Sequence, residues 1–460
     1  MSNDHSGAPG MVLRLAQWIE DFAAAPVSAA SREYTRLILL DSFGCALHAH
    51  DDDKSKAALA VAAAVGRPGA CTLIGTPERT SLPLAAFANG VLIRTLDLND
   101  TYVGPRQVGH PSDNIGAALA AAEASGASGD DLLRAIRLGY EIYGRILDLG
   151  NPESPWDHVT VSGLVTAAMV GLLLRLPPER LAHALALAAM HCATLGEVRV
   201  GQISAAKSIA NSVVVQTAAL MTLLAAEGMT GPAQALEGER GYANLIMEGI
   251  DFSAFFDTTG PEDRILSVGI KQFPCFALAQ GPISAAIELR ERLKGDVAAV
   301  DTVNIAIANT GPARLRLRDA HGRSPTSREA ADHSLYFLVA IALLDGRVTL
   351  EQFKGDRWKD ADVHDVIARM SAAIDPALEP ASALPCRLEA TLKDGRTIVI
   401  QRAASPGSPS ARLTREEVED KFRACAGALL NAERQQQVID LVGRLEQLPS
   451  VSPVMAALVP

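Results

Sequence analysis

A cluster of polar residues at positions 94–114 lies between two strongly apolar segments of the chain. Burying a polar group without a hydrogen bond costs about 1–3 kcal/mol, so such a concentration fits an exposed loop or a functional site. The imidazole of His110 can exchange protons near neutral pH, and Asp97 or Asp100 could orient it. Alternatively, the polar residues could form loop caps and Asx-turns. The side chains concerned are Asp97, Asn99, Asp100, Thr101, His110, Ser112, Asp113 and Asn114.

A second candidate, His158, comes directly before an apolar segment in the sequence WDHVTVSGLVTAAM. The imidazole of His158 could exchange protons near neutral pH. Asp157 and His158 could equally form the first turn of that helix, because Asp is a favoured capping residue. The local sequence leaves both interpretations open.

Two cations form a third candidate in the sequence TLGEVRVGQISAAKSIANS. Arg199 and Lys207 flank a glycine-containing loop, and Lys207 is expected near the start of a helix that runs to Glu227. The helix dipole disfavours a cation at this end, so the placement indicates a role in proton transfer or in binding a substrate carboxylate. The alternative is an ordinary pair of surface cations.

Two kinds of sequence must position these residues. Residues 11–268 are rich in Ala and Leu at helical spacing, and segments such as LVTAAMVGLLLRL are apolar nearly all round, as in the interior of a helical bundle. Later, VDTVNIAIANT alternates like a strand, and CRLEATLKDGRTIVIQR is typical of a hairpin that turns at Asp394-Gly395. We therefore predict a mainly α protein, in which residues 1–268 and 405–460 form a large all-helical domain and residues 269–404 an inserted, smaller α+β domain.

These motifs resemble those of the MmgE/PrpD family, and they occur in the family's order. The resemblance is carried by LLDSFGCAL, LDLNDTY, GHPSDN and the pattern V-R-x-G-x-x-S-x-x-K. It implies a helical domain with an inserted α+β lid, an active site between the two, and a homodimer. The catalytic residues that it implies are Asp97, Thr101, His110, His158 and Lys207. The matching positions that would bind the substrate are Arg199, Ser204 and Lys271.

The resemblance also implies a cofactor-independent lyase that dehydrates a small di- or tricarboxylic hydroxy acid, as the family's 2-methylcitrate dehydratases do. A base would remove the proton α to a carboxylate, and an acid would assist the departure of hydroxide. Arg199 and Lys207 would bind carboxylates and stabilise the charge that develops on them. Two alternatives remain open: an epimerase of a dicarboxylate, and a non-catalytic relative that binds carboxylates.

The sequence departs from the family pattern where the smaller domain begins. In KQFPCFALAQGPISAAIEL, Leu278 and Gln280 occupy the places of family histidines, and the stretch contains no histidine. Glutamine can hydrogen-bond a carboxylate but cannot act as an acid or a base near neutral pH. Gln280 is therefore predicted to bind substrate, and a step that needs the histidine is expected to be absent or reassigned. Further along, we interpret Asp332 and His333 as structural.

The composition argues against several other classes of protein. The formal net charge of −11 does not favour a nucleic-acid surface, which needs clustered Lys and Arg. The 6 cysteines are scattered, and the sequence has neither zinc-ligand spacing nor a GxGxxG motif, so we expect no metal and no cofactor. There is no uninterrupted apolar run of membrane-spanning length and no secretory signal. We expect a cytoplasmic protein whose partner is a small carboxylate.

Overall fold

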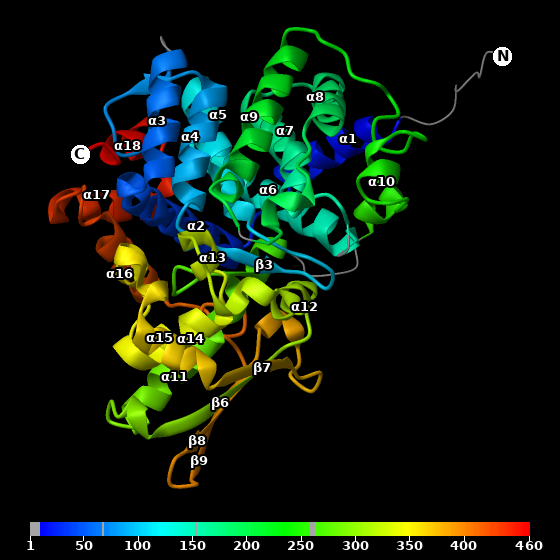
Figure 1. Ribbon diagram of the computed structural model, residues 1–460. Coiled ribbons are helices and arrows are strands. Elements are labelled where there is room, and N and C mark those ends of the chain that lie inside the picture. The colour runs from blue at the N-terminus through cyan, green and yellow to red at the C-terminus, as the bar shows by residue number, and fades with distance from the viewer. Residues whose placement is uncertain (1–9, 67–68, 152–153, 202, 258–262) are drawn as a thin grey trace.

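The computed structural model describes residues 10–66, 69–151, 154–201, 203–257 and 263–460. Figure 1 shows a large helical body above a smaller part that carries the main sheet, so the mainly α fold predicted from the sequence is confirmed. The N-terminal part of the chain forms the following helices of the body: α1 (Met11–Ala24), α2 (Ala29–His48), α3 (Asp53–Val65), α4 (Leu82–Arg94), α5 (Ile115–Ser125), α6 (Gly129–Leu149), α7 (Ser162–Leu173), α8 (Pro178–His191), α9 (Ala206–Ala226) and α10 (Tyr242–Leu245).

The helical body is built around one hydrophobic core. The core includes side chains between Val12 and Ile270 and again between Val418 and Leu458. Helices α5 and α7 are buried on nearly every side, as their apolar sequences predict. Each buried Val, Leu, Ile or Phe side chain contributes roughly 1.5–3 kcal/mol to folding, so this core holds the polar segments that cross it in fixed positions.

The smaller part combines a four-stranded sheet with five helices and has a core of its own between Phe273 and Ile400. We propose that the two cores are the two domains expected from the sequence, and we call residues 269–404 the lid. Its strands are β6 (Val300–Ile307), β7 (Met370–Ile374), β8 (Cys386–Leu392) and β9 (Thr397–Arg402). Its helices are α11 (Gln280–Arg292), α12 (Gly311–Arg318), α13 (Arg328–Ala331), α14 (Leu335–Asp345) and α15 (Ala361–Ala368).

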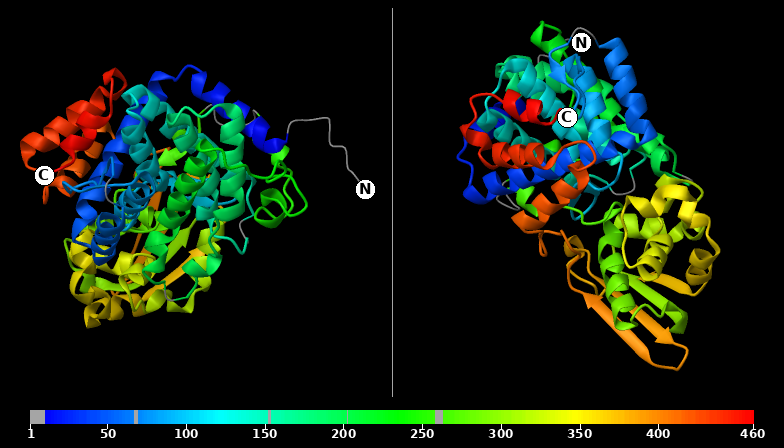
Figure 2. Two further views of the ribbon diagram at one scale, coloured as in Figure 1. Left: turned by 90° about the horizontal axis from the view of Figure 1, so that it is seen from above. Right: turned by 90° about the vertical axis from the view of Figure 1, so that its left-hand side faces the viewer.

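The sheet of the lid has the order β7-β6-β8-β9. Strand β6 pairs in parallel with β7 and antiparallel with β8, and β8 continues into β9 through the predicted hairpin. Gly395 has a φ of 87° in that turn, a conformation that glycine adopts without a steric penalty. Figure 2 shows this hairpin at the end of the lid that is remote from the helical body.

The chain returns to the helical body after the lid. The returning helices are α16 (Arg415–Ala426), α17 (Ala432–Gly443) and α18 (Ser452–Ala457), and the first two pack against α2. Thr414 and Glu417 form a capping box at the start of α16, in which each side chain satisfies a backbone N–H at the helix terminus. In Figure 1 these helices lie beside α2 although they come from the opposite end of the sequence.

Helix α9 is long and apolar enough to cross a membrane by length and composition alone, and half of its most apolar window is buried inside the protein. It packs against α4, α7 and α8 in the helical body. A core helix of a globular protein has the same features. We therefore describe α9 as a central helix of the body.

The polar segment at residues 94–114 crosses from the end of α4 to the start of α5. It contains two short strands, β3 (Thr101–Val103) and β4 (Val108–Gly109), and a 3-10 turn from Pro111 to Asn114. Strand β3 also pairs with β5 (Val268–Gly269), which leads directly into the lid. A separate two-stranded sheet joins β1 (Cys71–Thr72) to β2 (Arg79–Thr80). The polar segment therefore lies at the junction of the body and the lid.

The side chain of Lys421 on α16 connects the returning helices to this junction, and substitution of Lys421 tests that role. Its ammonium forms an ion pair with the buried Asp41 at 2.5 Å and donates to the carbonyl oxygens of Leu98 and Lys271. We predict that Lys421→Met lowers the free energy of unfolding in urea by about 3–5 kcal/mol, because Asp41 is left buried without a counter-charge.

Lys359→Met is the matched control for this experiment. Lys359 forms its ion pair with Asp356 at the surface, where such pairs contribute roughly 0–1 kcal/mol. Equal losses of stability in the two variants would contradict the role assigned to Lys421.

Candidate active site at the junction of body and lid

Asp97 lies at the centre of a buried cluster of charges. Its side chain is 1% exposed, and its carboxylate accepts hydrogen bonds from Arg94 at 2.8 Å, from Lys207 at 2.8 Å and from Lys271. Burial alone would raise the pKa of this carboxyl, but the three positive charges hold it well below its ordinary value. Asp97 is therefore ionised at neutral pH and is shared by three buried cations.

The three cations come from separate elements. Arg94 is the last residue of α4, Lys207 lies in the first turn of α9, and Lys271 follows β5 at the start of the lid. Lys271 also donates to the backbone carbonyl of Asp97 at 3.0 Å, which fixes the turn where Asp97 has a φ of 52°. Asp is one of the few residues other than glycine that adopt this left-handed conformation readily. One carboxylate thus joins a helix end, a helix start and the lid.

Lys207 is poised to transfer a proton. Burial lowers the pKa of its ammonium to about 8, although the negative charges of Asp332 and Asp97 oppose the shift. At pH 7 the side chain is still mainly protonated, and its proton is more acidic than that of an exposed lysine. This makes Lys207 a suitable general acid near neutral pH.

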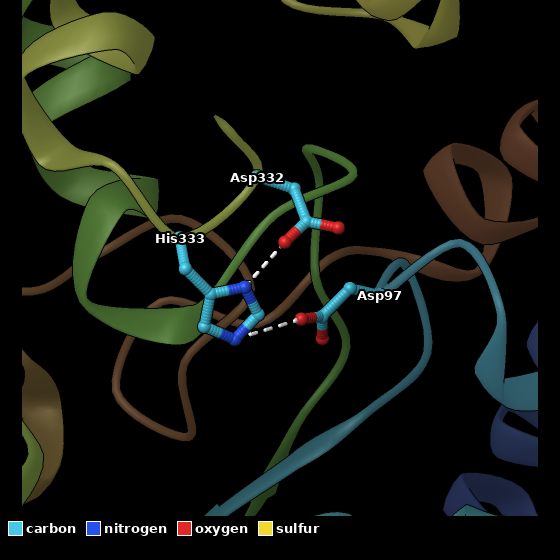
Figure 3. A group of neighbouring side chains, drawn as sticks. All are labelled: Asp97, Asp332 and His333. Atoms are coloured by element: carbon cyan, nitrogen blue, oxygen red, sulfur yellow. Dashed lines mark hydrogen bonds and ion pairs between the residues drawn. The ribbon is translucent and has the colours of Figure 1, made fainter. Parts of the chain in front are cut away.

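The lid adds a histidine to the cluster. Figure 3 shows the ring of His333 between the carboxylates of Asp332 and Asp97. Its Nδ1 hydrogen-bonds to Asp332, its Nε2 lies 3.4 Å from Asp97 Oδ2, and its ring stacks on Phe276 at 5.6 Å between centroids. Burial and the charge of Lys207 lower the pKa of His333 to about 3, against the opposing effect of Asp332. His333 therefore belongs to the charged cluster.

Asp97, Asp332 and His333 are also the residues that could hold a metal ion, since their ligand atoms lie within 4.8 Å of one another. The charges around them do not fit a divalent cation. Lys207 and Lys271 already pair with Asp97, and Lys207 lies 3.8 Å from Asp332. A metal ion would have to displace these ammonium groups or be repelled by them. The cluster is better suited to an anionic ligand.

His110 is held in one tautomer beside this cluster. Its Nδ1 lies 2.7 Å from the carbonyl oxygen of Asp100, which can only accept a hydrogen bond, so Nδ1 carries the proton. The hydroxyl of Thr101 lies 3.3 Å from the same nitrogen. Burial and the charges of Arg94 and Lys271 lower the pKa of His110 well below its ordinary value. The ring is therefore neutral at pH 7, with a lone pair on Nε2 that can accept a proton.

The carboxylate of Asp100 has a structural task. It accepts hydrogen bonds from the backbone and hydroxyl of Ser112 and from the hydroxyl of Tyr140, at 3.2, 2.6 and 2.7 Å. These bonds hold the 3-10 turn that follows His110. Burial raises the pKa of Asp100 to about 7, although the two hydroxyl donors oppose the shift. Of the two residues expected to orient His110, Asp100 does so through its backbone carbonyl, and Asp97 forms no hydrogen bond with the ring among the described residues.

His158 lies next to His110, with ring centroids 6.0 Å apart. Its Nδ1 is 3.3 Å from Asp157 Oδ1, and its Nε2 is buried without a partner among the described residues. Burial lowers the pKa of His158 to about 3, although the charge of Asp157 opposes the shift. Asp157 also caps the turn that begins at His158, as one reading of the sequence suggested. His158 thus follows the residue that caps this turn, and its Nε2 has no partner among the described residues.

Arg199 is anchored by the same aspartate. Its guanidinium donates to the two carboxylate oxygens of Asp157 at 2.5 and 3.2 Å. A planar guanidinium held on one side in this way keeps further N–H groups for a second anion. The structure therefore brings Arg199 and His158 together through Asp157.

Two predicted substrate residues are placed differently from our expectation. Ser204 is exposed, and its backbone carbonyl accepts a hydrogen bond from the N–H of Lys207. Gln280 is buried, and its amide oxygen accepts from the N–H groups of Gln272 and Phe273 while its amide nitrogen donates to Phe273 and to Cys275 Sγ. All four hydrogen-bonding positions of the amide are used inside the protein. Gln280 therefore fixes the loop after Lys271 and is not free to bind a carboxylate.

Sequence patterns gave Arg94 no role and led us to interpret His333 as structural, although both side chains contact Asp97. Arg94 ends an otherwise apolar helix, AAFANGVLIR, and a buried arginine at that position signals a buried carboxylate partner. His333 follows an aspartate just before the apolar segment of α14, the same arrangement as Asp157 and His158. The repeated Asp-His pair was the available signal for the lid histidine.

A cleft of about 810 Å³ runs along the outer side of the β3–β4 hairpin. Its lining includes Arg106, Arg145 and Arg264 but not Asp97, His110 or Lys207. Arg145 and Arg264 are both paired with Glu141, so their charge is compensated inside the protein. Asp97 is 1% exposed, and contacts such as Lys54–Glu329 and Arg328–Asp52 join the lid to the body.

Two family models match the chain. The MmgE/PrpD N-terminal domain matches residues 13–254, and the MmgE/PrpD C-terminal domain matches residues 273–447. The chain belongs to the MmgE/PrpD family. The boundary between the two matches falls at the junction where β5 enters the lid, beside the charged cluster.

Curated relatives of this MmgE/PrpD chain include a decarboxylase and dehydratases. Human cis-aconitate decarboxylase is 28% identical over 402 residues, which cover 83% of this chain and 80% of that protein. The 2-methylcitrate dehydratase of Cupriavidus necator is 28% identical over 395 residues, with 81% and 80% covered. That of Escherichia coli K12 is 26% identical over 449 residues, with 89% and 90% covered. The chain is thus similar to lyase-type enzymes over most of its length.

The structural role of Gln280 can be tested by stability. We predict that Gln280→Ala lowers the free energy of unfolding by about 1–3 kcal/mol, because buried backbone groups of the loop lose their partner. The control is Gln272→Ala, an exposed glutamine in the same loop, which should change stability by less than ~0.5 kcal/mol. Urea denaturation measures both variants. If Gln280→Ala is as stable as the wild type, the structural role is refuted and Gln280 is again a candidate for binding the substrate.

Proposed function

We propose that this MmgE/PrpD protein is a cofactor-independent lyase that dehydrates a small di- or tricarboxylic hydroxy acid. The observation that supports this most strongly is that a neutral histidine, His110, and an acidic ammonium, Lys207, both lie within the electrostatic influence of Asp97, to which Lys207 is hydrogen-bonded. Elimination of water needs a base for the α-proton and an acid for the departing hydroxide, and these two groups are in the required protonation states at pH 7.

His110 is the proposed base. Its Nδ1 proton is committed to the Asp100 carbonyl, so a proton taken from the substrate would bind to Nε2. Burial and the charges of Arg94 and Lys271 disfavour the imidazolium formed, and the negative charge of Asp97 opposes this effect in part. His158, also neutral and 6.0 Å away, is a second acceptor for the same proton.

Lys207 is the proposed acid. Its hydrogen bond to Asp97 and its contact with His333 Nδ1 at 3.4 Å hold the ammonium at the centre of the cluster. After it gives a proton to the leaving hydroxide, the neutral amine can be recharged from solvent when the product leaves. Lys271, which also pairs with Asp97, keeps a positive charge in place during this step, so the ionised Asp97 is never left uncompensated.

The similarity to both dehydratases and a decarboxylase makes the reaction type the first thing to measure. Purified protein is incubated in deuterium oxide with 2-methylcitrate, citrate, cis-aconitate or iminodisuccinate and followed by proton NMR. The proposal predicts a vinylic product from 2-methylcitrate or citrate. Exchange of the α-proton without elimination would show that the reaction is epimerisation and not dehydration. Loss of carbon dioxide from cis-aconitate would show that it is decarboxylation. Binding without any turnover would leave a carboxylate-binding relative.

Substitution of the base is expected to abolish most of the activity. His110→Asn keeps a donor for the Asp100 carbonyl but has no basic nitrogen, and we predict a fall in kcat of at least ~100-fold. Lys207→Ala should cause a similar fall through loss of the acid. His364→Ala, at an exposed position on α15, is the control and should retain wild-type kcat. Wild-type rates in both of the first two variants would refute the assignment.

The pH dependence of kcat/KM should report Lys207. Activity is predicted to fall about tenfold per pH unit above about pH 8, where the ammonium loses its proton. No acid limb from His110, His158 or His333 is expected near pH 6.5, the ordinary pKa of histidine, because burial keeps these rings neutral at lower pH. Activity that persists undiminished to pH 10 would contradict the assignment of Lys207 as the acid.

A further inference from the structure

Four charged side chains outside the Asp97 cluster join the lid to the helical body. On the body, Asp52 caps α3 and Lys54 lies in its first turn. On the lid, Arg328 and Glu329 begin α13. Figure 1 shows α13 at the edge of the lid that faces the helical body. We call these four residues the latch.

The contacts of the latch cross from one domain to the other. Lys54 donates a hydrogen bond to Glu329 at 2.6 Å and pairs with Asp52 at 3.2 Å. Arg328 donates to Asp52 at 2.8 Å. The four side chains are 12–18% exposed, so salt and solvent screen these contacts less than contacts on an open surface.

The chain crosses between the body and the lid at two adjacent positions. It enters the lid after β5 and leaves it after β9, and the N–H of Ile270 at the first crossing donates to the carbonyl of Gly407 at the second, at 2.9 Å. Adjacent crossings of this kind can serve as a hinge, because only a few backbone dihedrals have to change. The orientation of the lid therefore depends on non-covalent contacts, which the latch and the Asp97 cluster provide.

Helix α13 connects the latch directly to the charged cluster. Asp332 and His333 follow its last residue, and the N–H of Asp332 donates to the carbonyl of Arg328 at 2.9 Å. Asp332 Oδ1 lies 3.8 Å from Lys207 Nζ, and His333 Nε2 lies 3.4 Å from Asp97 Oδ2. Since a single helical turn separates the latch from these two side chains, a shift of the latch moves both of them.

A further contact joins the start of α13 to the segment that precedes Lys207. The hydroxyl of Ser327, which caps α13, donates to the carbonyl of Ile203 at 2.9 Å. The carbonyl of the next residue, Ser204, accepts from the N–H of Lys207 at 3.1 Å. The beginning of α13 is thus fixed both to α3 and to the backbone before α9.

We propose that the latch positions the proton donor of the reaction: by fixing α13, it holds Asp332 and His333 against Lys207. This inference deepens the proposed function and rests on it for the reaction that is measured. No latch residue forms a hydrogen bond or an ion pair with Lys207 within the described parts of the chain, so the latch acts through α13. Without it, the ammonium would lose the neighbours that fix its direction, and proton transfer depends on that geometry.

Charge reversal of one latch pair tests the proposal, with 2-methylcitrate as substrate. Lys54→Glu places two carboxylates together and Glu329→Lys places two ammonium groups together, whereas the double variant Lys54→Glu/Glu329→Lys restores opposite charges. Each single reversal is expected to lower kcat at least ~10-fold, a size found for coupled charged neighbours, and the double variant to recover to within ~3-fold of the wild type. The fall is expected in kcat and not in KM, because the latch acts on the proton donor and is not among the proposed substrate contacts.

A distance measurement tests the latch without any turnover. Spin labels are attached to Lys56→Cys on α3 and to Arg347→Cys after α14, both at exposed positions, and the distance between them is followed by pulsed electron paramagnetic resonance. The 6 native cysteines are buried, so the labels react at the introduced positions. The distance distribution between body and lid is expected to be narrow in the wild type and in the double variant, and broader in each single reversal.

Glu446→Lys is the matched control. Its ion pair with Arg36 has similar burial, with side chains 24% and 17% exposed, but lies entirely within the body. This variant should keep the kcat and the distance distribution of the wild type.

Three results would overturn the proposal. These are wild-type kcat in both single reversals, a double variant as impaired as the single ones, or a loss confined to KM. If no acid is turned over, the lyase is refuted and the distance measurement alone decides. Broad distributions in the single reversals that become narrow again in the double variant would then support the latch, and the same distribution in all four proteins would refute it.

Discussion

The candidate site depends on the buried carboxylate of Asp97, which pairs with three buried cations, two of which also lie near Asp113 or Asp332. Isolated ammonium or guanidinium groups are too costly to bury, so Arg94, Lys207 and Lys271 can meet inside the protein only around an anion. These residues come from the end of α4, the start of α9 and the entry to the lid. The ion cluster therefore fixes how the helical body and the lid meet, and it defines where a substrate carboxylate would be attracted.

The same electrostatic environment determines the protonation states that the chemistry needs. Burial next to fixed positive charges keeps His110 neutral and makes Lys207 more acidic than an ordinary lysine. The same surroundings therefore keep the proposed base, His110, neutral and the proposed acid, Lys207, protonated at pH 7. His333 joins this group from the lid.

The sequence predicted much of the fold but only part of the site. Helical spacing, the Asp394-Gly395 turn and the alternating strands were strong local signals, and the structure confirms the elements they indicated. The partners of side chains depend on contacts between distant segments, which local patterns do not contain. Gln280 illustrates this limit, because its amide could have bound a substrate or a loop, and only the fold shows that Gln272 and Phe273 use it. His333 lies in the cluster because the lid returns its Asp-His pair to Asp97, across more than half of the chain.

The central claim is that the Asp97 carboxylate sets the charge state of the site, and the pKa of Lys207 tests it most directly. Protein labelled with ¹³C at lysine Cε is titrated by NMR, with the Lys207 resonance assigned from Lys207→Arg. The account predicts that Lys207 titrates at about 8 in the wild type, and at least ~1 unit lower in Asp97→Asn because its counter-charge is lost. A Lys207 that titrates near 10.5 in both proteins would contradict the account, since it would then be an ordinary solvated lysine.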